Sequence, residues 1–97
     1  MTLSQRKQAI KSKYHPRHLS PILESDLEED EQNFLALCSF HEDEVGSMLF
    51  YPDPNSNWKF KCLHCGIQGD LLKFAQKSQR WSWEETLSWF EKQIAKD

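Results

Sequence analysis

Two segments near the C-terminus carry the helical periodicity of apolar and polar residues. Ser82 and Glu85 have the spacing of a capping box, which marks the start of a helix. Apolar residues follow at helical spacing at Trp83, Leu87, Phe90 and Ile94. Further upstream, Asp70 is a candidate cap for a helix that ends near Gln79 and carries on one face Leu71, Phe74 and Ala75. We therefore predict two amphipathic helices.

The middle of the chain has the pattern of a β-hairpin. Residues 47–51 are apolar and aromatic, and residues 58–62 alternate apolar with basic side chains, as a half-buried strand does. Residues 52–57 contain two prolines with Asp, Asn and Ser, which is the composition of a turn. Alternation places Lys59 and Lys61 together on one face and the apolar side chains on the other.

The first 33 residues lack such a pattern. We expect residues 2–13 to form a short helix with Ser4 as its cap, solvated basic side chains and little to bury. Residues 24–31 are so acidic that we expect a solvated linker or a fraying helix. The prediction is a partly flexible extension over residues 1–33, basic and then acidic, followed by one small α+β domain over residues 34–97, in which two C-terminal helices flank an antiparallel sheet.

Charge is arranged in blocks along the chain. The 97 residues have a formal net charge of −3. Residues 1–19 carry five basic residues and no acid, residues 20–33 carry six acids and no Lys or Arg, and residues 58–81 are basic again. This pattern excludes a uniformly basic nucleic-acid binder, so any polyanion would have to bind locally.

All three cysteines fall in a pattern of metal ligands. Cys38 and His41 form one pair with two intervening residues, Cys62 and Cys65 form another, and twenty residues separate the pairs. The predicted hairpin would bring the two pairs together around one tetrahedral zinc ion. Three thiolates and one imidazole close the coordination shell, so we expect a structural zinc and no catalytic one.

Other interpretations of these residues are weaker but remain open. His15 and His18 have the same two-residue gap and could join Cys62 and Cys65 in a two-His, two-Cys site. His64 lies between Cys62 and Cys65, where its side chain is poorly placed to reach the same metal, and we expect it to be exposed. Residues 62–65 also have the spacing of a redox dithiol, although the strand-helix-strand pattern of such enzymes is missing. Ordinary core cysteines would not explain the matched spacing.

Nothing in the chain has the pattern of a catalytic site. The acids at 28–31 lie in the predicted linker, and residues 66–69 lack the lysine and strand context of a phosphate-binding loop. The odd cysteine count and the absence of a leader or long apolar run favour a reducing, cytoplasmic setting. We expect no membrane partner and no small-molecule substrate.

Three stretches carry a resemblance to a known family: residues 36–41 (ALCSFH), 60–66 (FKCLHCG) and 69–74 (GDLLKF). They resemble the N-terminal zinc-binding domain of bacterial DnaG-type DNA primases, and the likeness covers residues 34–94. It implies a zinc-ribbon-like sheet with flanking helices that binds single-stranded template DNA and helps to choose where a primer starts. Primer synthesis in that family needs a separate catalytic domain, so the resemblance implies a module that is no enzyme by itself.

The chain departs from the family at the first ligand pair. Ser39 stands where the family has proline, and residues 42–48 (EDEVGSM) replace a segment such as Glu-Lys-Thr-Pro-Ser-Phe. A basic position has thereby become acidic. These departures leave the expected ligands in place and bear on how DNA is contacted.

A basic and aromatic surface is the expected DNA contact. Its candidate residues are Tyr51, Lys59, Lys61, Lys73, Lys77 and Arg80. The lysines could instead offset the thiolate charge or discourage strand pairing. The rival hypothesis is a zinc-scaffolded protein-interaction or regulatory module of a replication or mobile-element protein, in which Trp81 and Trp89 dock a partner such as a primase catalytic domain or a helicase.

Overall fold

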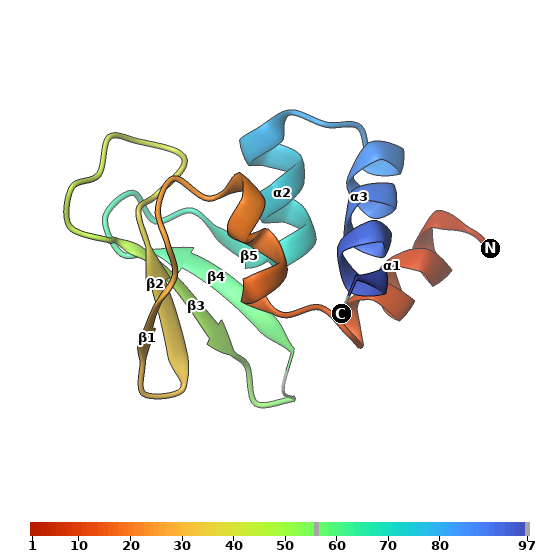
Figure 1. Ribbon diagram of the computed structural model, residues 1–97, viewed down its shortest axis with the longest axis horizontal. Helices are drawn as coiled ribbons and strands as arrows, with labels where there is room; N and C mark the ends of the chain where they lie inside the picture. The colour runs from red at the N-terminus through yellow and green to blue at the C-terminus, as the bar shows by residue number, and fades with distance from the viewer. Residues whose placement is uncertain (56, 97) are drawn as a thin grey trace.

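Five antiparallel strands form one sheet in the order β1-β2-β3-β4-β5, and three α-helices lie beside it (Figure 1). The computed structural model describes residues 1–55 and 57–96; Ser56, in the predicted turn, and Asp97 lie outside the described residues. The elements are α1 (Leu3–Lys11), the 3-10 helix η1 (Pro16–Ile22), β1 (Glu28–Asp30), β2 (Asn33–Ala36), β3 (Met48–Pro52), β4 (Trp58–Cys62), β5 (Gln68–Asp70), α2 (Leu71–Gln79) and α3 (Trp83–Ala95). The predicted fold class, a small α+β domain, is confirmed.

The predicted hairpin is strands β3 and β4. Phe50 pairs with Phe60 and Met48 with Cys62, which places these side chains on the buried face. Asp53 orders the turn, because its Oδ1 accepts from the N–H groups of Asn55 and Asn57, both at 2.9 Å. The short strand β5 was not predicted; it adds to β4 directly before α2.

Helix α2 covers the buried face of the sheet. Asp70 caps it through the N–H of Lys73, at the predicted position. Phe74 is fully buried, and its ring packs edge-on against the rings of Phe50 and Phe60. Gly69 permits close packing at the start of this helix, since a Cβ there would lie 2.6 Å from the Lys73 side chain.

Helix α3 begins with the predicted capping box of Ser82 and Glu85. Leu87 and Phe90 are buried, whereas Trp83 is 37% exposed. Trp83 lies in the first helical turn and contacts α1, where the Lys7 ammonium sits over its ring, 4.0 Å from the centroid.

The N-terminal segment packs on the helices and buries apolar side chains. Helix α1 lies against α3, and Ile10, Tyr14 and Leu19 belong to the core (Figure 1). The Arg6 guanidinium donates to the carboxylates of Glu84 and Glu91, each at 2.6 Å. The expectations of little to bury and of a Ser4 cap are therefore wrong: Thr2 caps α1, in a capping box with Gln5.

The acidic segment also differs from its prediction. Glu28–Asp30 forms the edge strand β1, which pairs with β2, and Glu31 adopts a positive φ of 58° in the turn between them. The linker or helix expected over residues 24–31 is wrong for this stretch, because backbone pairing with β2 overrides its polar composition. A separately folded unit starting at residue 34 stays a prediction.

Candidate metal centre and nucleic-acid face

The two predicted ligand pairs converge at one end of the hairpin. Cys38 follows β2, Cys62 ends β4, and the ligand atoms of Cys38, His41, Cys62 and Cys65 all lie within 4.8 Å of one another. Zinc–sulfur bonds of about 2.3 Å give tetrahedral edges of about 3.8 Å, so these atoms can surround one ion after a small inward movement. Donor type and spacing both fit a closed zinc site.

The His41 imidazole has the orientation of a zinc ligand. Its Nδ1 lies 2.6 Å from the carbonyl oxygen of Glu42, and its Nε2 lies 3.1 Å from the Cys62 sulfur. A carbonyl can only accept, so Nδ1 carries the proton and the lone pair of Nε2 faces the cluster. The carbonyl of Glu42, and secondarily the Cys62 sulfur, raise the pKa of His41.

Backbone N–H groups donate hydrogen bonds to the sulfurs of the two buried cysteines, Cys38 and Cys62. The N–H of Cys65 donates to the Cys62 sulfur at 3.3 Å, and that of Phe40 donates to the Cys38 sulfur at 3.4 Å. Burial alone would raise the pKa of Cys62, but hydrogen bonds led by those from the backbone N–H groups of Cys65 and His64 outweigh it and lower this pKa to about 6. Burial raises the pKa of Cys38 to about 12. Cys62 therefore ionises more readily than Cys38 near neutral pH.

The alternative histidines lie outside the four-donor cluster. His64 is exposed, with its ring 4.9 Å from the ring of His41. His15 packs edge-on against Phe34 and Trp58, and His18 is buried in η1. Among the described residues, the two-His, two-Cys alternative is therefore not formed.

Asp43 is a residue of this centre that the sequence reasoning missed. Its carboxylate accepts hydrogen bonds from the backbone N–H groups of Cys38, Val45 and Ser47. The bond from Ser47, followed by the one from Cys38, holds the pKa of Asp43 well below its usual range. Aspartate side chains often accept from the N–H two residues further on, as Asp43 does from Val45. This Asx-turn spacing was the sequence signal that could have indicated a role for Asp43.

The candidate DNA-contact residues fall into two groups. Lys59 pairs in register with Tyr51 on the face opposite the buried side chains, next to the exposed Lys61. Lys77 is exposed on α2, which packs against the other face, and Arg80 is exposed directly after this helix. The Lys73 ammonium donates to the carbonyl oxygen of Gln68 at 2.9 Å. Tyr51, Lys59 and Lys61 thus share one face of the sheet, whereas Lys77 and Arg80 lie apart from them.

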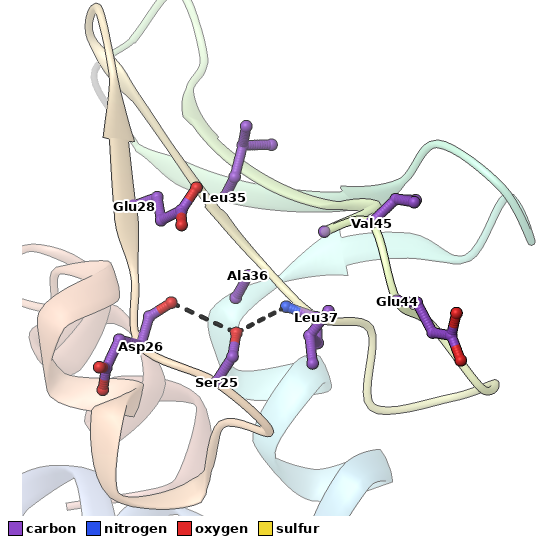
Figure 2. Close-up of a pocket in the computed structure, with 9 residues that line it drawn as sticks. Ser25, Asp26, Glu28, Leu35, Ala36, Leu37, Glu44 and Val45 are labelled. Atoms are coloured by element: carbon purple, nitrogen blue, oxygen red, sulfur yellow. Dashed lines mark hydrogen bonds between the residues drawn. The ribbon is translucent and has the colours of Figure 1, made fainter.

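A groove with an acidic rim lies at the β1–β2 side of the sheet (Figure 2). Its volume is about 410 Å³, and Asp26, Glu28 and Glu44 surround an apolar floor that includes Leu35 and Val45. Ser25 closes one end, where its hydroxyl accepts from the N–H of Leu37 at 2.9 Å (Figure 2). Residues 18–58 contain no Lys or Arg, so this side of the domain repels polyanions.

Fold and site together define a small zinc-binding domain. The chain belongs to the CHC2 zinc finger family, the zinc ribbon of DnaG, whose match spans residues 6–96. This family and the Cys-His-Cys-Cys cluster assign one structural zinc ion to the domain. The resemblance to DnaG-type primases is confirmed.

Individual relatives agree with the family. The chain is 34% identical over 90 residues to the DNA primase of Mycoplasma pneumoniae, covering 90% of this chain and 13% of that protein. It is 39% identical over 66 residues to the DNA primase of Aquifex aeolicus, covering 68% and 11%. The chain thus spans about an eighth or less of the length of these two primases.

A solved structure shares the fold. The crystal structure of the Aquifex aeolicus primase, comprising its zinc-binding and RNA polymerase domains, matches 93% of this chain and 21% of its own, with a TM-score of 0.73 and 25% identity. Within residues 1–55 and 57–96, no helix combines the length and apolar character needed to cross a bilayer.

Proposed function

We propose that Cys38, His41, Cys62 and Cys65 hold the structural zinc and that the domain binds single-stranded DNA through Tyr51, Lys59 and Lys61, without catalysing a reaction itself. The observation that carries the proposal is the cross-strand pair of Tyr51 and Lys59 beside Lys61, on the hairpin whose end forms the metal centre. Zinc would hold this end of the hairpin together, as structural zinc ions do in small domains.

The chemistry of this face suits a single strand. An aromatic ring stacks on a base of any identity, and an adjacent ammonium group pairs with the phosphate that links it to the next base. Neither the Lys59 nor the Lys61 ammonium group forms a hydrogen bond or ion pair with any described residue, so both are available. Template recognition in DNA replication is the role that the primase family supports.

The charge distribution limits where a strand can lie. The acidic rim formed by Asp26, Glu28 and Glu44 disfavours a path across β1 and β2. A strand is therefore expected to follow β3 and β4, with Lys73 at one side. Because few phosphates are neutralised there, affinity should be modest and strongly dependent on salt.

Catalysis would have to come from elsewhere. Four protein ligands close the proposed zinc shell and leave no position for water or substrate. The primase relatives extend far beyond the matched segment, so a primase catalytic domain or a helicase in the cytoplasm is the proposed protein partner.

The test is a fluorescence titration with an oligothymidine strand at several salt concentrations. Replacing Lys59 and Lys61 by glutamine should weaken binding. It should also reduce the steepness of the slope of log affinity against log salt concentration by about 1.4, since each phosphate contact contributes about 0.7 to this slope on single strands. The matched control is the double glutamine variant of Lys92 and Lys96, exposed lysines at the far end of α3. No binding by the unmodified protein at low ionic strength, or equal losses in both variants, would reject the proposal.

The rival interaction module loses its main support. It required exposed Trp81 and Trp89, but both side chains are half-buried, with their ring centroids 5.4 Å apart. Trp89 also packs edge-on against Phe90. The tryptophan pair packs against the buried core, so we favour DNA binding as the function.

A further inference from the structure

Asp43 occupies the loop between the first ligand pair and strand β3. Its Oδ2 accepts from the N–H groups of Cys38 at 2.9 Å and Ser47 at 2.7 Å. Its Oδ1 accepts from the N–H of Val45 at 3.2 Å and the hydroxyl of Ser47 at 3.1 Å. One carboxylate therefore ties the backbone at the first ligand to the residue that precedes β3.

The same network reaches the second ligand pair. The carbonyl oxygen of Ser47 accepts from the N–H of Leu63 at 2.8 Å, and Leu63 lies between Cys62 and Cys65. A continuous path of hydrogen bonds thus runs from Cys38 through Asp43 and Ser47 to the second pair. Ser47 is only 8% exposed, so water competes weakly for these bonds.

We propose that Asp43 is a positioning residue that sets the two ligand pairs at the separation required by zinc without touching the ion. Both carboxylate oxygens are engaged by backbone donors and Ser47, and Asp43 is not part of the four-donor cluster. The residues between His41 and Met48 form no helix or strand, so side-chain hydrogen bonds hold the chain on the C-terminal side of the first pair. The inference rests on the proposed ligand set.

Asp43→Asn is the direct perturbation. An amide replaces one acceptor oxygen by an NH₂ donor, which must then face a backbone N–H on one of its two sides. Asp53→Asn is the matched control, because Asp53 also accepts backbone N–H groups but uses a single oxygen in the β3–β4 turn. An amide at position 53 can keep both bonds with its remaining oxygen.

Two measurements separate positioning from general stability. The first is the rate and extent of zinc transfer to a chromogenic chelator, and Asp43→Asn should lower zinc affinity by about tenfold to a hundredfold, as loss of an outer-shell partner does. The second is the spectrum of the cobalt(II)-substituted protein. Partial displacement of Cys38 should reduce thiolate-to-cobalt absorbance by up to about one third, since one thiolate of three is affected.

Ser47→Ala is the second variant, and it removes only the hydroxyl bond to Oδ1. It should shift zinc affinity in the same direction by a smaller factor, and it decides the question if Asp43→Asn does not fold. Chelator transfer and cobalt spectra identical to those of Asp53→Asn would overturn the role of Asp43, as would an unchanged affinity in Ser47→Ala when Asp43→Asn cannot be prepared. A wild-type protein that binds no stoichiometric zinc would instead overturn the ligand set.

Discussion

Replacing Phe74 by alanine should destabilise the domain more than any surface change, because this ring joins three parts of the fold. Phe74 is fully buried on α2. Its ring centroid lies 5.5 Å from that of Phe50, 5.3 Å from that of Phe60 and 5.6 Å from that of Phe40. Phe40 lies between the proposed ligands Cys38 and His41, so Phe74 connects the helix, the hairpin and the first proposed ligand pair.

The expected loss follows from burial and ring contacts. Truncation of a buried Phe to Ala costs about 3–5 kcal/mol. Aromatic pairs contribute about 0.5–1.5 kcal/mol each beyond area, and all three at Phe74 would be lost. A domain of this size is stable by about 5–15 kcal/mol, so the variant loses a large share of its stability. At about 4–8 °C per kcal/mol, the melting temperature should fall by at least about 12 °C.

The assay is thermal unfolding of the zinc-loaded protein, followed by near-ultraviolet circular dichroism. Phe74→Leu, which keeps most of the apolar volume, should lose less than half as much. Zinc affinity should fall in the alanine variant, because Phe40 keeps the ring of Phe60 but loses that of Phe74. A loss below about 1 kcal/mol in Phe74→Ala would refute the assignment of this ring as the junction of the core.

Two further perturbations test the N-terminal segment. Ile10→Ala should cost about 2–5 kcal/mol in urea unfolding, because Ile10 is 3% exposed, whereas a flexible extension would show no change. The hydrogen bond from Arg6 lowers the pKa of Glu91 in the folded protein. The ion pair therefore stabilises the fold fully above the ordinary pKa of 4.5, and this stabilisation is lost as the pH falls through the lowered pKa of folded Glu91. Arg6→Ala should therefore lower the melting temperature at pH 7, and the melting temperature of this variant should fall less steeply in acid than that of the unmodified protein. An identical dependence of melting temperature on pH in the variant and the unmodified protein would contradict the ion pair.

The elements predicted correctly from sequence are those specified by neighbouring residues. The caps at Asp70 and Ser82 and the turn after β3 are local signals, and they placed α2, α3 and the hairpin within one residue of their observed bounds. The convergence of the ligand pairs was predictable for the same reason, because spacing within each pair and the hairpin between them determine it.

The elements that were missed depend on contacts with other segments, one of them nearby in the sequence and one far away. Strand β1 is acidic and exposed, and it exists because β2 pairs with it. Helix α1 is held by Arg6, whose partners Glu84 and Glu91 are 78 and 85 residues away. Lys77 and Arg80 share a charge block with Lys59 and Lys61, but a helix and a strand carry them on different faces. Charge runs along a sequence therefore did not define one surface.

Native mass spectrometry of the reduced, folded protein measures directly whether the four proposed ligands hold zinc. We expect one zinc ion per chain, retained when His64 is replaced by asparagine and lost when Cys62 or Cys65 is replaced by serine. Folded wild-type protein without zinc, or undiminished zinc in both serine variants, would contradict this expectation.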